Sequence, residues 1–147
     1  MILCRVAAVK TVDDDELVAR ALAQRSRAYA PYSRFTVGAA LLCADGSVVE
    51  GCNVENASYG LCICAERTAV AAAVAQGKTK FTRIAIATGS TPPAAPCGMC
   101  RQVLAEFSGD ADVVIVLAND HGQRTTTTLS ALFPGVFDHA QLLSGQS

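Results

Sequence analysis

The sequence predicts an α/β domain built on one mixed β-sheet with helices on both faces. Short apolar runs rich in β-branched residues alternate with alanine-rich or amphipathic runs, in the order β-β-α-β-α-β-β after a leading helix. A chain of 147 residues has the length of one domain and can bury a core without disulfide bonds. We therefore predict an N-terminal extension, residues 1–12, and a single domain, residues 13–147.

The leading helix is expected to begin at three consecutive aspartates. Asp13, Asp14 and Asp15 offer an N-cap and negative charge, and both stabilise a helix N-terminus. Apolar residues at helical spacing continue to about Ala28, and Pro31 ends the helix. A metal site made of the three aspartates is the poorer interpretation, because no other acidic residue patterns with them.

A β-hairpin follows this helix. Alternating β-forming residues predict a strand over Phe35–Cys43, Asp45-Gly46 predicts a tight turn, and Val48–Asn53 predicts the returning strand. Gly38 lies inside the first strand and indicates a close approach by a helix or by a neighbouring chain. By composition alone, Phe35 is expected to belong to the core.

The later elements follow from periodicity and from glycine and proline breakers. A polar loop is expected over Asn53–Leu61 and a proline-rich loop over Gly89–Pro96. The other expected elements are a helix over Cys64–Gln76, a strand over Phe81–Thr88, a helix over Cys97–Phe107, strands over Asp112–Ala118 and Arg124–Thr128, a helical turn over Leu129–Phe133 capped by Thr128, and a short tail helix.

Charge and cysteine content exclude several classes of protein. A net charge of −1 gives no footprint for nucleic acid, and no apolar run reaches the length of a transmembrane helix. The seven cysteines are an odd number and three have metal-ligand spacing, which favours a reducing compartment over a disulfide framework. We therefore expect a cytoplasmic protein whose partners are neither nucleic acid nor membrane. Cys43 and Cys52 are expected to be small buried hydrophobic residues.

Two motifs carry the chemistry, Cys-Ala-Glu at residues 64–66 and Pro-Cys-Gly-Met-Cys at residues 96–100. Catalytic zinc sites use three protein ligands and leave the fourth tetrahedral position to water. Cys64, Cys97 and Cys100 would be these ligands. They would sit at the starts of two helices, whose partial positive charge stabilises thiolates.

Two residues next to Cys64 would complete the site. Glu66 cannot easily join the ligands, but it lies beside the open position, where it could take a proton from the bound water. Arg67 is well placed to hydrogen bond to a thiolate and so offset the negative charge of the three sulfurs.

These motifs resemble the cytidine deaminase family, whose zinc signature is H-x-E or C-x-E followed by P-C-x-x-C. The residues that carry the resemblance are PYSRFTVGAAL at 31–41, GCNVENASYG at 51–60, CAERTA at 64–69 and CGMCRQVL at 97–104, and it extends from about Asp14 to Phe137. The C-x-E form and the short chain are typical of the family's homotetrameric branch.

The resemblance implies a fold, a cofactor and a reaction. The fold would be a three-layer α/β/α sandwich around a five-stranded mixed sheet in the strand order 2-1-3-4-5, and the cofactor one Zn²⁺ per chain. The reaction would be hydrolytic deamination of cytidine and 2′-deoxycytidine, as in pyrimidine salvage. Hydroxide would attack C4 of the base, and Glu66 would protonate N3 and later the departing ammonia.

The resemblance also assigns contacts to the substrate. Phe35 would form a wall against the nucleoside. Asn53 and Glu55, whose side chains the strand period places on the same side, would bind the ribose. Backbone groups near Ala65 and Cys97 would hold the amide edge of the base.

Two further aromatic residues would act between subunits. Tyr59 and Phe137 match residues that reach a neighbouring subunit's site, so a homotetramer would complete each active site. By residue type alone, Phe137 could instead anchor the tail on its own domain, and Asn53 and Glu55 could cap a loop.

Other interpretations remain open from the sequence. Cys62 could supply a fourth thiolate, which would make the zinc site closed and structural. Deaminases of other cytosine compounds, such as blasticidin deaminases, share the zinc motif. A structural zinc module that binds a protein or nucleic acid is a third possibility. His121 and His139 have no partners at ligand spacing and are expected at the surface.

Overall fold

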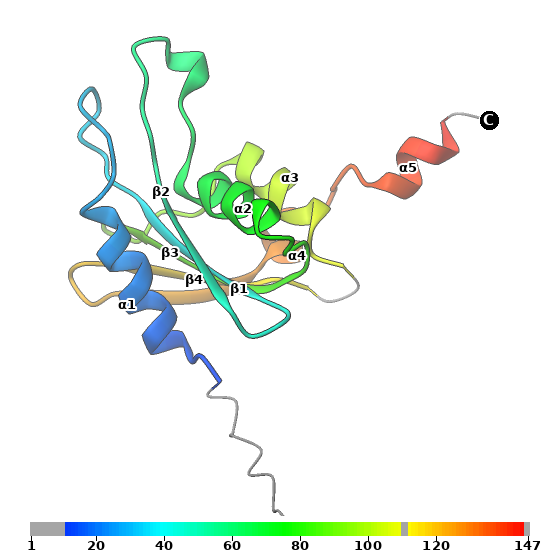
Figure 1. Ribbon diagram of the computed structural model, residues 1–147, viewed down its shortest axis with the longest axis horizontal. Helices are drawn as coiled ribbons and strands as arrows, with labels where there is room; N and C mark the ends of the chain where they lie inside the picture. Colours follow the sequence, from blue (N-terminus) through cyan, green and yellow to red (C-terminus); the bar gives the residue numbers. More distant parts are fainter. Residues whose placement is uncertain (1–10, 110–111, 146–147) are drawn as a thin grey trace, which may run out of the picture.

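The computed structural model describes residues 11–109 and 112–145, which form a five-stranded sheet with helices packed on it (Figure 1). The helices are α1 (Asp14–Arg25), α2 (Ala65–Ala75), α3 (Gly98–Glu106), α4 (Leu129–Leu132) and α5 (His139–Ser144), with a 3₁₀ turn η1 (Tyr59–Leu61). The strands are β1 (Gly38–Cys43), β2 (Val48–Cys52), β3 (Phe81–Thr88), β4 (Val114–Asn119) and β5 (Arg124–Thr128). Most of the predicted extension, with Cys4, lies outside the described residues.

The strand order is β2-β1-β3-β4-β5, as predicted. β1 pairs antiparallel with both β2 and β3, β3 pairs parallel with β4, and β4 pairs antiparallel with β5. The one parallel pair needs a crossover connection, and α3 supplies it. The sheet is therefore mixed, and its single parallel pair ends next to the loop that leads into α3.

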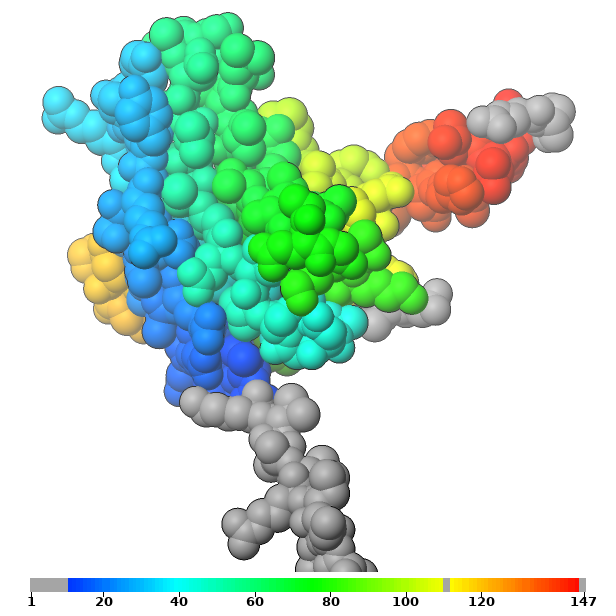
Figure 2. Space-filling view, viewed as in Figure 1, coloured from blue at the N-terminus to red at the C-terminus, as the bar shows by residue number. Residues whose placement is uncertain are grey.

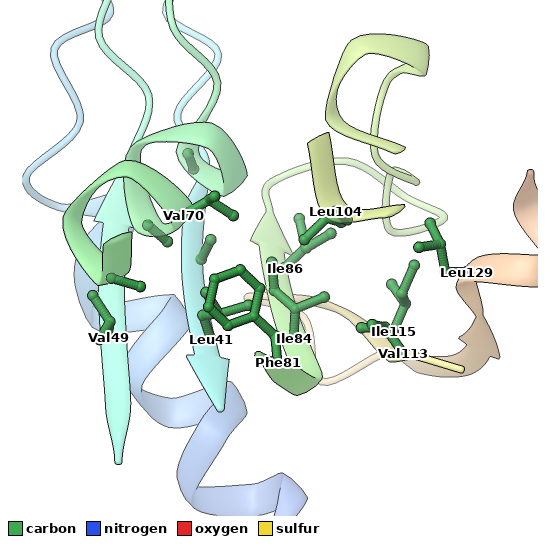
Figure 3. Close-up of a cluster of buried hydrophobic side chains, with 14 of the residues drawn as sticks. Leu41, Val49, Val70, Phe81, Ile84, Ile86, Leu104, Val113, Ile115 and Leu129 are labelled. Carbon is green, nitrogen blue, oxygen red and sulfur yellow. The ribbon is translucent and has the colours of Figure 1, made fainter. Parts of the chain in front are cut away.

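The sheet separates two hydrophobic clusters. Ala39 and Leu41 of β1 join the larger cluster with α2 and α3, whereas Ala40, between them, joins the cluster of α1. Such alternation is what the strand period requires when both faces are covered. Figure 3 shows the larger cluster, in which Leu41, Ile84 and Ile86 lie close to Val70 and Leu104. The three-layer α/β/α architecture is confirmed.

The start of α1 is formed as predicted. The carboxylate of Asp13 accepts a hydrogen bond from the backbone N–H of Glu16 at 2.9 Å, which makes Asp13 the N-cap. Asp14 pairs with Arg83, and Asp15 pairs with Arg124 at 2.7 Å. The helix ends at Arg25, three residues before the predicted Ala28.

The chain leaves α1 early because it joins a second, irregular pairing. The N–H of Tyr29 bonds the carbonyl of Asn53 at 3.0 Å, and the N–H of Glu55 bonds the carbonyl of Tyr29 at 2.7 Å. Val54 in turn bridges to Ile63. These bonds hold Tyr29, residues 53–55 and Ile63 together beside the end of the hairpin where β1 starts and β2 stops. The predicted site residues lie at this end.

Three expectations for the hairpin are wrong: where β1 begins, the burial of Phe35 and the burial of Cys52. β1 begins at Gly38 and not at Phe35, because the carbonyl of Phe35 and the N–H of Val37 bond the side chain of Asn53. Phe35 is consequently not a core residue: 45% of its surface is exposed. Cys43 is buried as predicted, but Cys52 is only half-buried, and its thiol donates to the carbonyl of Arg27.

Glycine at position 38 allows α1 to contact the sheet. A Cβ atom on Gly38 would lie 2.0 Å from the carbonyl oxygen of Ala21 and 2.8 Å from the backbone N of Arg25. The close approach predicted for Gly38 therefore comes from a helix. Gly51 on β2 faces α2 in the same way: a Cβ atom there would lie 2.5 Å from the backbone N of Ala69.

The C-terminal elements vary in how they join the domain. The hydroxyl of Thr128 caps α4 by accepting from the N–H of Ala131, as predicted, and Leu129 is buried in the core. α5 begins at its N-cap Asp138 and stands away from the sheet in Figures 1 and 2. None of the helices formed by the described residues is long and apolar enough to cross a membrane.

Replacing Gly38 by alanine should destabilise the fold. The added methyl meets backbone atoms of α1, so the helix must shift, and we expect a loss of about 1–3 kcal/mol in the free energy of unfolding. Urea denaturation followed by circular dichroism measures this loss. Gly60→Ala is the matched control, because a Cβ atom there has open space. Equal midpoints for the two variants would contradict the prediction.

Candidate metal and active site

Two helix N-termini bring the three predicted ligands together. Cys64 is the N-cap residue of α2, Cys97 is the N-cap residue of α3, and Cys100 lies in the first turn of α3. The N–H groups of a helix's first turn have no partner within the helix and carry partial positive charge. The chain thus places its three thiols where thiolates are stabilised.

The geometry of the cluster fits a tetrahedral zinc ion. The three Sγ atoms all lie within 4.8 Å of one another, and those of Cys64 and Cys97 are 3.8 Å apart. A tetrahedron with Zn–S bonds of about 2.3 Å has S···S edges of about 3.8 Å. Three soft sulfur donors with a free fourth position are the ligand set of a catalytic zinc site.

The sulfurs also interact electrostatically. The thiol of Cys100, followed by the guanidinium of Arg67, lowers the pKa of Cys64 well below its usual value. The interaction with Cys64, followed by burial, raises the pKa of Cys100. A negative charge on Cys64 therefore makes the loss of a proton from Cys100 more costly, and a cation that binds between the sulfurs offsets that cost.

Arg67 lies beside Cys64, three residues along α2. Its Nη2 donates to the carbonyl of Cys62 at 3.0 Å and approaches the Sγ of Cys64 at 3.8 Å. Its Nε is buried and has no hydrogen-bond partner among the described residues. The guanidinium therefore brings positive charge to the sulfurs from inside the protein.

Glu66 is almost fully buried, with 4% of its surface exposed. Burial is the main cause that raises its pKa above the usual value of a carboxyl group, and the negative charge of Cys64 adds to it. A raised pKa makes the carboxylate a better acceptor for a proton. Glu66 lines a cavity of about 250 Å³ together with Cys64 and Cys97.

The walls of this cavity include most of the predicted substrate contacts. Phe35, Asn53 and Glu55 line it, and Ala65 is buried next to Glu66 without reaching its surface. Its other lining residues are Ser33, Val37, Val54, Cys62, Ile63, Ile86, Thr88, Ala94 and Ala95. The lining contains no lysine or arginine.

Asn53 fixes the segment that carries Phe35. Its Oδ1 accepts from the N–H of Val37 at 2.8 Å, and its Nδ2 donates to the carbonyl of Phe35 at 2.8 Å. One carboxamide therefore bonds both sides of Thr36, and the backbone N–H of Asn53 adds a bond to the carbonyl of Val37 at 3.2 Å.

Glu55 accepts hydrogen bonds from the opposite turn. Its carboxylate accepts from the N–H groups of Tyr32 at 2.9 Å and Ser33 at 3.2 Å, and from the hydroxyl of Ser33. The Ser33 hydroxyl is the main cause that holds the pKa of Glu55 below its usual value, so the group is anionic at neutral pH. Ser33 is not among the predicted site residues, although it lies in segment 31–41, which carries part of the family resemblance.

Tyr59 and Phe137 lie outside the cavity that contains Glu66. Tyr59 is 75% exposed on η1, where its ring packs edge-on against Tyr32 with centroids 6.0 Å apart. Phe137 is 57% exposed in the segment before α5, and its carbonyl accepts from the side chain of Gln102. Neither residue reaches the cavity within one copy of the described chain.

The remaining candidate ligands are not part of the cluster. Within the described residues, the metal-like cluster contains Cys64, Cys97 and Cys100 and no further thiol. Cys62 instead accepts from the N–H of Asn56 at 3.3 Å and donates to the carbonyl of the same residue. This arrangement argues against the closed four-cysteine site. His121 and His139 are exposed, as predicted.

Residues 11–117 match the family model of the cytidine and deoxycytidylate deaminase zinc-binding region. The chain belongs to this family. The match covers both zinc motifs, strands β1 to β3 and the first four residues of β4. The family's zinc-binding region and the cysteine cluster together support one zinc ion per chain.

Individual relatives agree with this assignment. A curated cytidine deaminase of Halalkalibacterium halodurans is 48% identical over 126 residues, which cover 86% of this chain and 95% of that protein. The crystal structure of cytidine deaminase from Burkholderia pseudomallei has a TM-score of 0.81 and 48% identity, covering 86% of this chain and all of that one. A blasticidin-S deaminase of Bacillus cereus is less similar, with 28% identity over 106 residues.

Single cysteine replacements should separate the ligands from Cys62. Cys64→Ser, Cys97→Ser and Cys100→Ser each remove a sulfur from the cluster, so we expect zinc content to fall from about one per chain to well below that value. Zinc per chain is measured by atomic absorption after gel filtration. Cys62→Ser is the control and should keep its zinc. Loss of zinc from Cys62→Ser would restore the four-cysteine interpretation.

Proposed function

We propose that this protein catalyses the zinc-dependent hydrolysis of cytidine and 2′-deoxycytidine to uridine and 2′-deoxyuridine, with release of ammonia, in pyrimidine salvage. The observation that carries the proposal is the buried Glu66, which meets the three-cysteine cluster in one cavity of about 250 Å³. The family and the cytidine deaminases reported above support the same reaction.

Cys64, Cys97 and Cys100 would hold the zinc ion. When bound, zinc supplies a water molecule acidic enough to react at neutral pH. Glu66 accepts the proton of this water and delivers it to N3 of the cytosine ring, which makes C4 more electrophilic. The hydroxide oxygen would bond to C4, and the same carboxylate would take the remaining hydroxyl proton and give it to the amino group. The amino group would leave as ammonia as the C4–N bond breaks and the C4 carbonyl forms. The raised pKa of Glu66 suits both halves of this transfer.

The cavity walls position the nucleoside. Phe35 packs against it, and backbone groups of Ala65 and Cys97 hold the amide edge of the base. Asn53 and Glu55 bind the ribose hydroxyls. Each of their side-chain polar atoms already has a partner, the Ser33 hydroxyl for Oε1 of Glu55 and backbone groups for the others, which fixes its direction. Carbonyl and carboxylate oxygens have more than one lone pair to offer.

The charge of the cavity favours a nucleoside over a nucleotide. Glu55 is anionic, and none of the lining residues is lysine or arginine. A 5′-phosphate bound here would lose part of its hydration shell and find no lysine or arginine side chain to pair with, which costs free energy. This distinction matters because the family model covers both cytidine and deoxycytidylate deaminases.

The rival functions have less support. A structural zinc module gives no role to a buried carboxyl group that opens into a cavity beside the cluster. Another cytosine compound remains the second candidate substrate, since the Bacillus cereus relative acts on blasticidin S by its name, but its identity to this chain is 28%.

We assign the active form to a cytoplasmic homotetramer in which Tyr59 and Phe137 reach a neighbouring subunit's site. Tyr59, Leu61, Ile63 and Met99 are all exposed apolar side chains near the cysteine cluster in sequence. A subunit interface would remove such surface from water. This assembly also gives the exposed Phe137 a role that a single copy does not provide.

Glu66→Gln should abolish deamination and leave zinc bound. The amide is close in size to the carboxyl group but cannot accept the proton, so we expect a loss of at least about 100-fold in kcat. Loss of the cytidine absorbance band measures turnover, and a zinc assay runs beside it. Wild-type protein that holds zinc but turns over none of cytidine, deoxycytidine or CMP would overturn the proposed function.

Sharing of sites between subunits can be tested by mixing two variants that are each impaired at a different part of the site. Phe137→Ala should lower activity with zinc retained, because each site then lacks its neighbour's ring. Subunits exchanged between Phe137→Ala and Glu66→Gln would form mixed assemblies with some complete sites. We expect activity to recover above the sum of the separate variants, whereas purely additive activity would show that Phe137 acts within its own chain.

A further inference from the structure

The guanidinium of Arg101 joins the cysteine loop to α4. Arg101 is one residue after Cys100 on α3. Its Nε donates to the carbonyl of Pro96 at 2.8 Å, and its Nη1 donates to the carbonyl of Leu132, the last residue of α4, at 2.7 Å.

Each end of this link is firmly placed. Pro96 is fully buried and directly precedes the ligand Cys97. α4 is fixed to the domain core, because its first residue, Leu129, is 5% exposed and donates its N–H to the carbonyl of Val113 at 2.9 Å. Arg101 therefore ties the start of α3 to an element that belongs to the core.

A link of this kind matters for the cluster because its ligands come from two helices. Cys97 and Cys100 lie on α3, whereas Cys64 lies on α2. Cys97 is exposed and has no side-chain cap bond of its own. Its sulfur stays 3.8 Å from that of Cys64 only while the start of α3 keeps its place.

Arginine suits the task better than lysine. Its planar guanidinium donates in fixed directions to two carbonyls at once, while an ammonium group is a point charge on a flexible stem. The positive charge of Arg101 also lies at the C-terminus of α4, where the partial negative charge of the helix end favours it.

We propose that Arg101 is the positioning residue of the zinc loop: by bonding the carbonyls of Pro96 and Leu132 it holds Cys97 at ligand distance from Cys64. The proposal rests on the three-cysteine metal site of the proposed function, and it does not depend on the identity of the substrate.

Competition with a chromogenic chelator tests the proposal. The zinc-loaded full-length chain is titrated, and zinc affinity and release rate are read from chelator absorbance. We expect Arg101→Met to bind zinc roughly tenfold to a hundredfold more weakly. Arg101→Lys, which can restore one bond but not both, should lie between Arg101→Met and wild type. If Arg101→Met does not fold, wild-type affinity in Arg101→Lys overturns the proposal.

Two control variants separate positioning from a general loss of stability. Arg83→Met removes an arginine that pairs with Asp14 on the α1 side of the sheet, and Gln102→Ala removes the neighbouring bond to the carbonyl of Phe137. Both should keep wild-type zinc affinity. Thermal midpoints of all variants are measured in parallel.

The outcomes are distinct. Zinc affinity lost in the Arg101 variants alone supports the proposal. Unchanged affinity in Arg101→Met overturns it, as does an equal loss in Arg83→Met at a similar thermal midpoint. Wild-type protein that binds zinc tightly but does not deaminate cytidine would defeat the proposed function and leave this result standing.

Discussion

The meeting of two helix N-termini is the constraint on which the rest of the structure depends. The sulfurs carried by the starts of α2 and α3 lie within 4.8 Å of one another, at the ends of the two helices that carry partial positive charge. This arrangement requires α2 to contact the sheet closely, and Gly51 permits it. It also places Glu66 in the first turn of α2, where the residue is buried yet adjacent to the cluster.

The irregular segments above the sheet form the remainder of the cavity. Residues 29–37 and 53–63 have few strand partners, and polar side chains supply the missing bonds. Asn53 bonds the backbone on both sides of Thr36, and Glu55 bonds the turn at Tyr32 and Ser33. The residues that would contact the ribose are thus the same ones that shape the loops.

Regular elements and the three-cysteine cluster could be predicted from the sequence because they depend on local patterns. Strand alternation, the Asp13 cap and the cysteine spacing each act over a few residues. The exposure of Phe35 and the half-burial of Cys52 could not be predicted in this way. Both depend on where Asn53 and Arg27 lie after folding, and these contacts cross from one segment to another.

The two-sided use of the Asn53 carboxamide has a consequence for redesign of the cavity. Aspartate in its place would set a second acceptor against the carbonyl of Phe35, and glutamine would carry the amide too far to bond residues 35 and 37 together. Phe35 contributes only its backbone to that contact, so its ring can be exchanged without disturbing it. An engineer who wants room for bulkier nucleosides should therefore vary position 35 and leave position 53 alone.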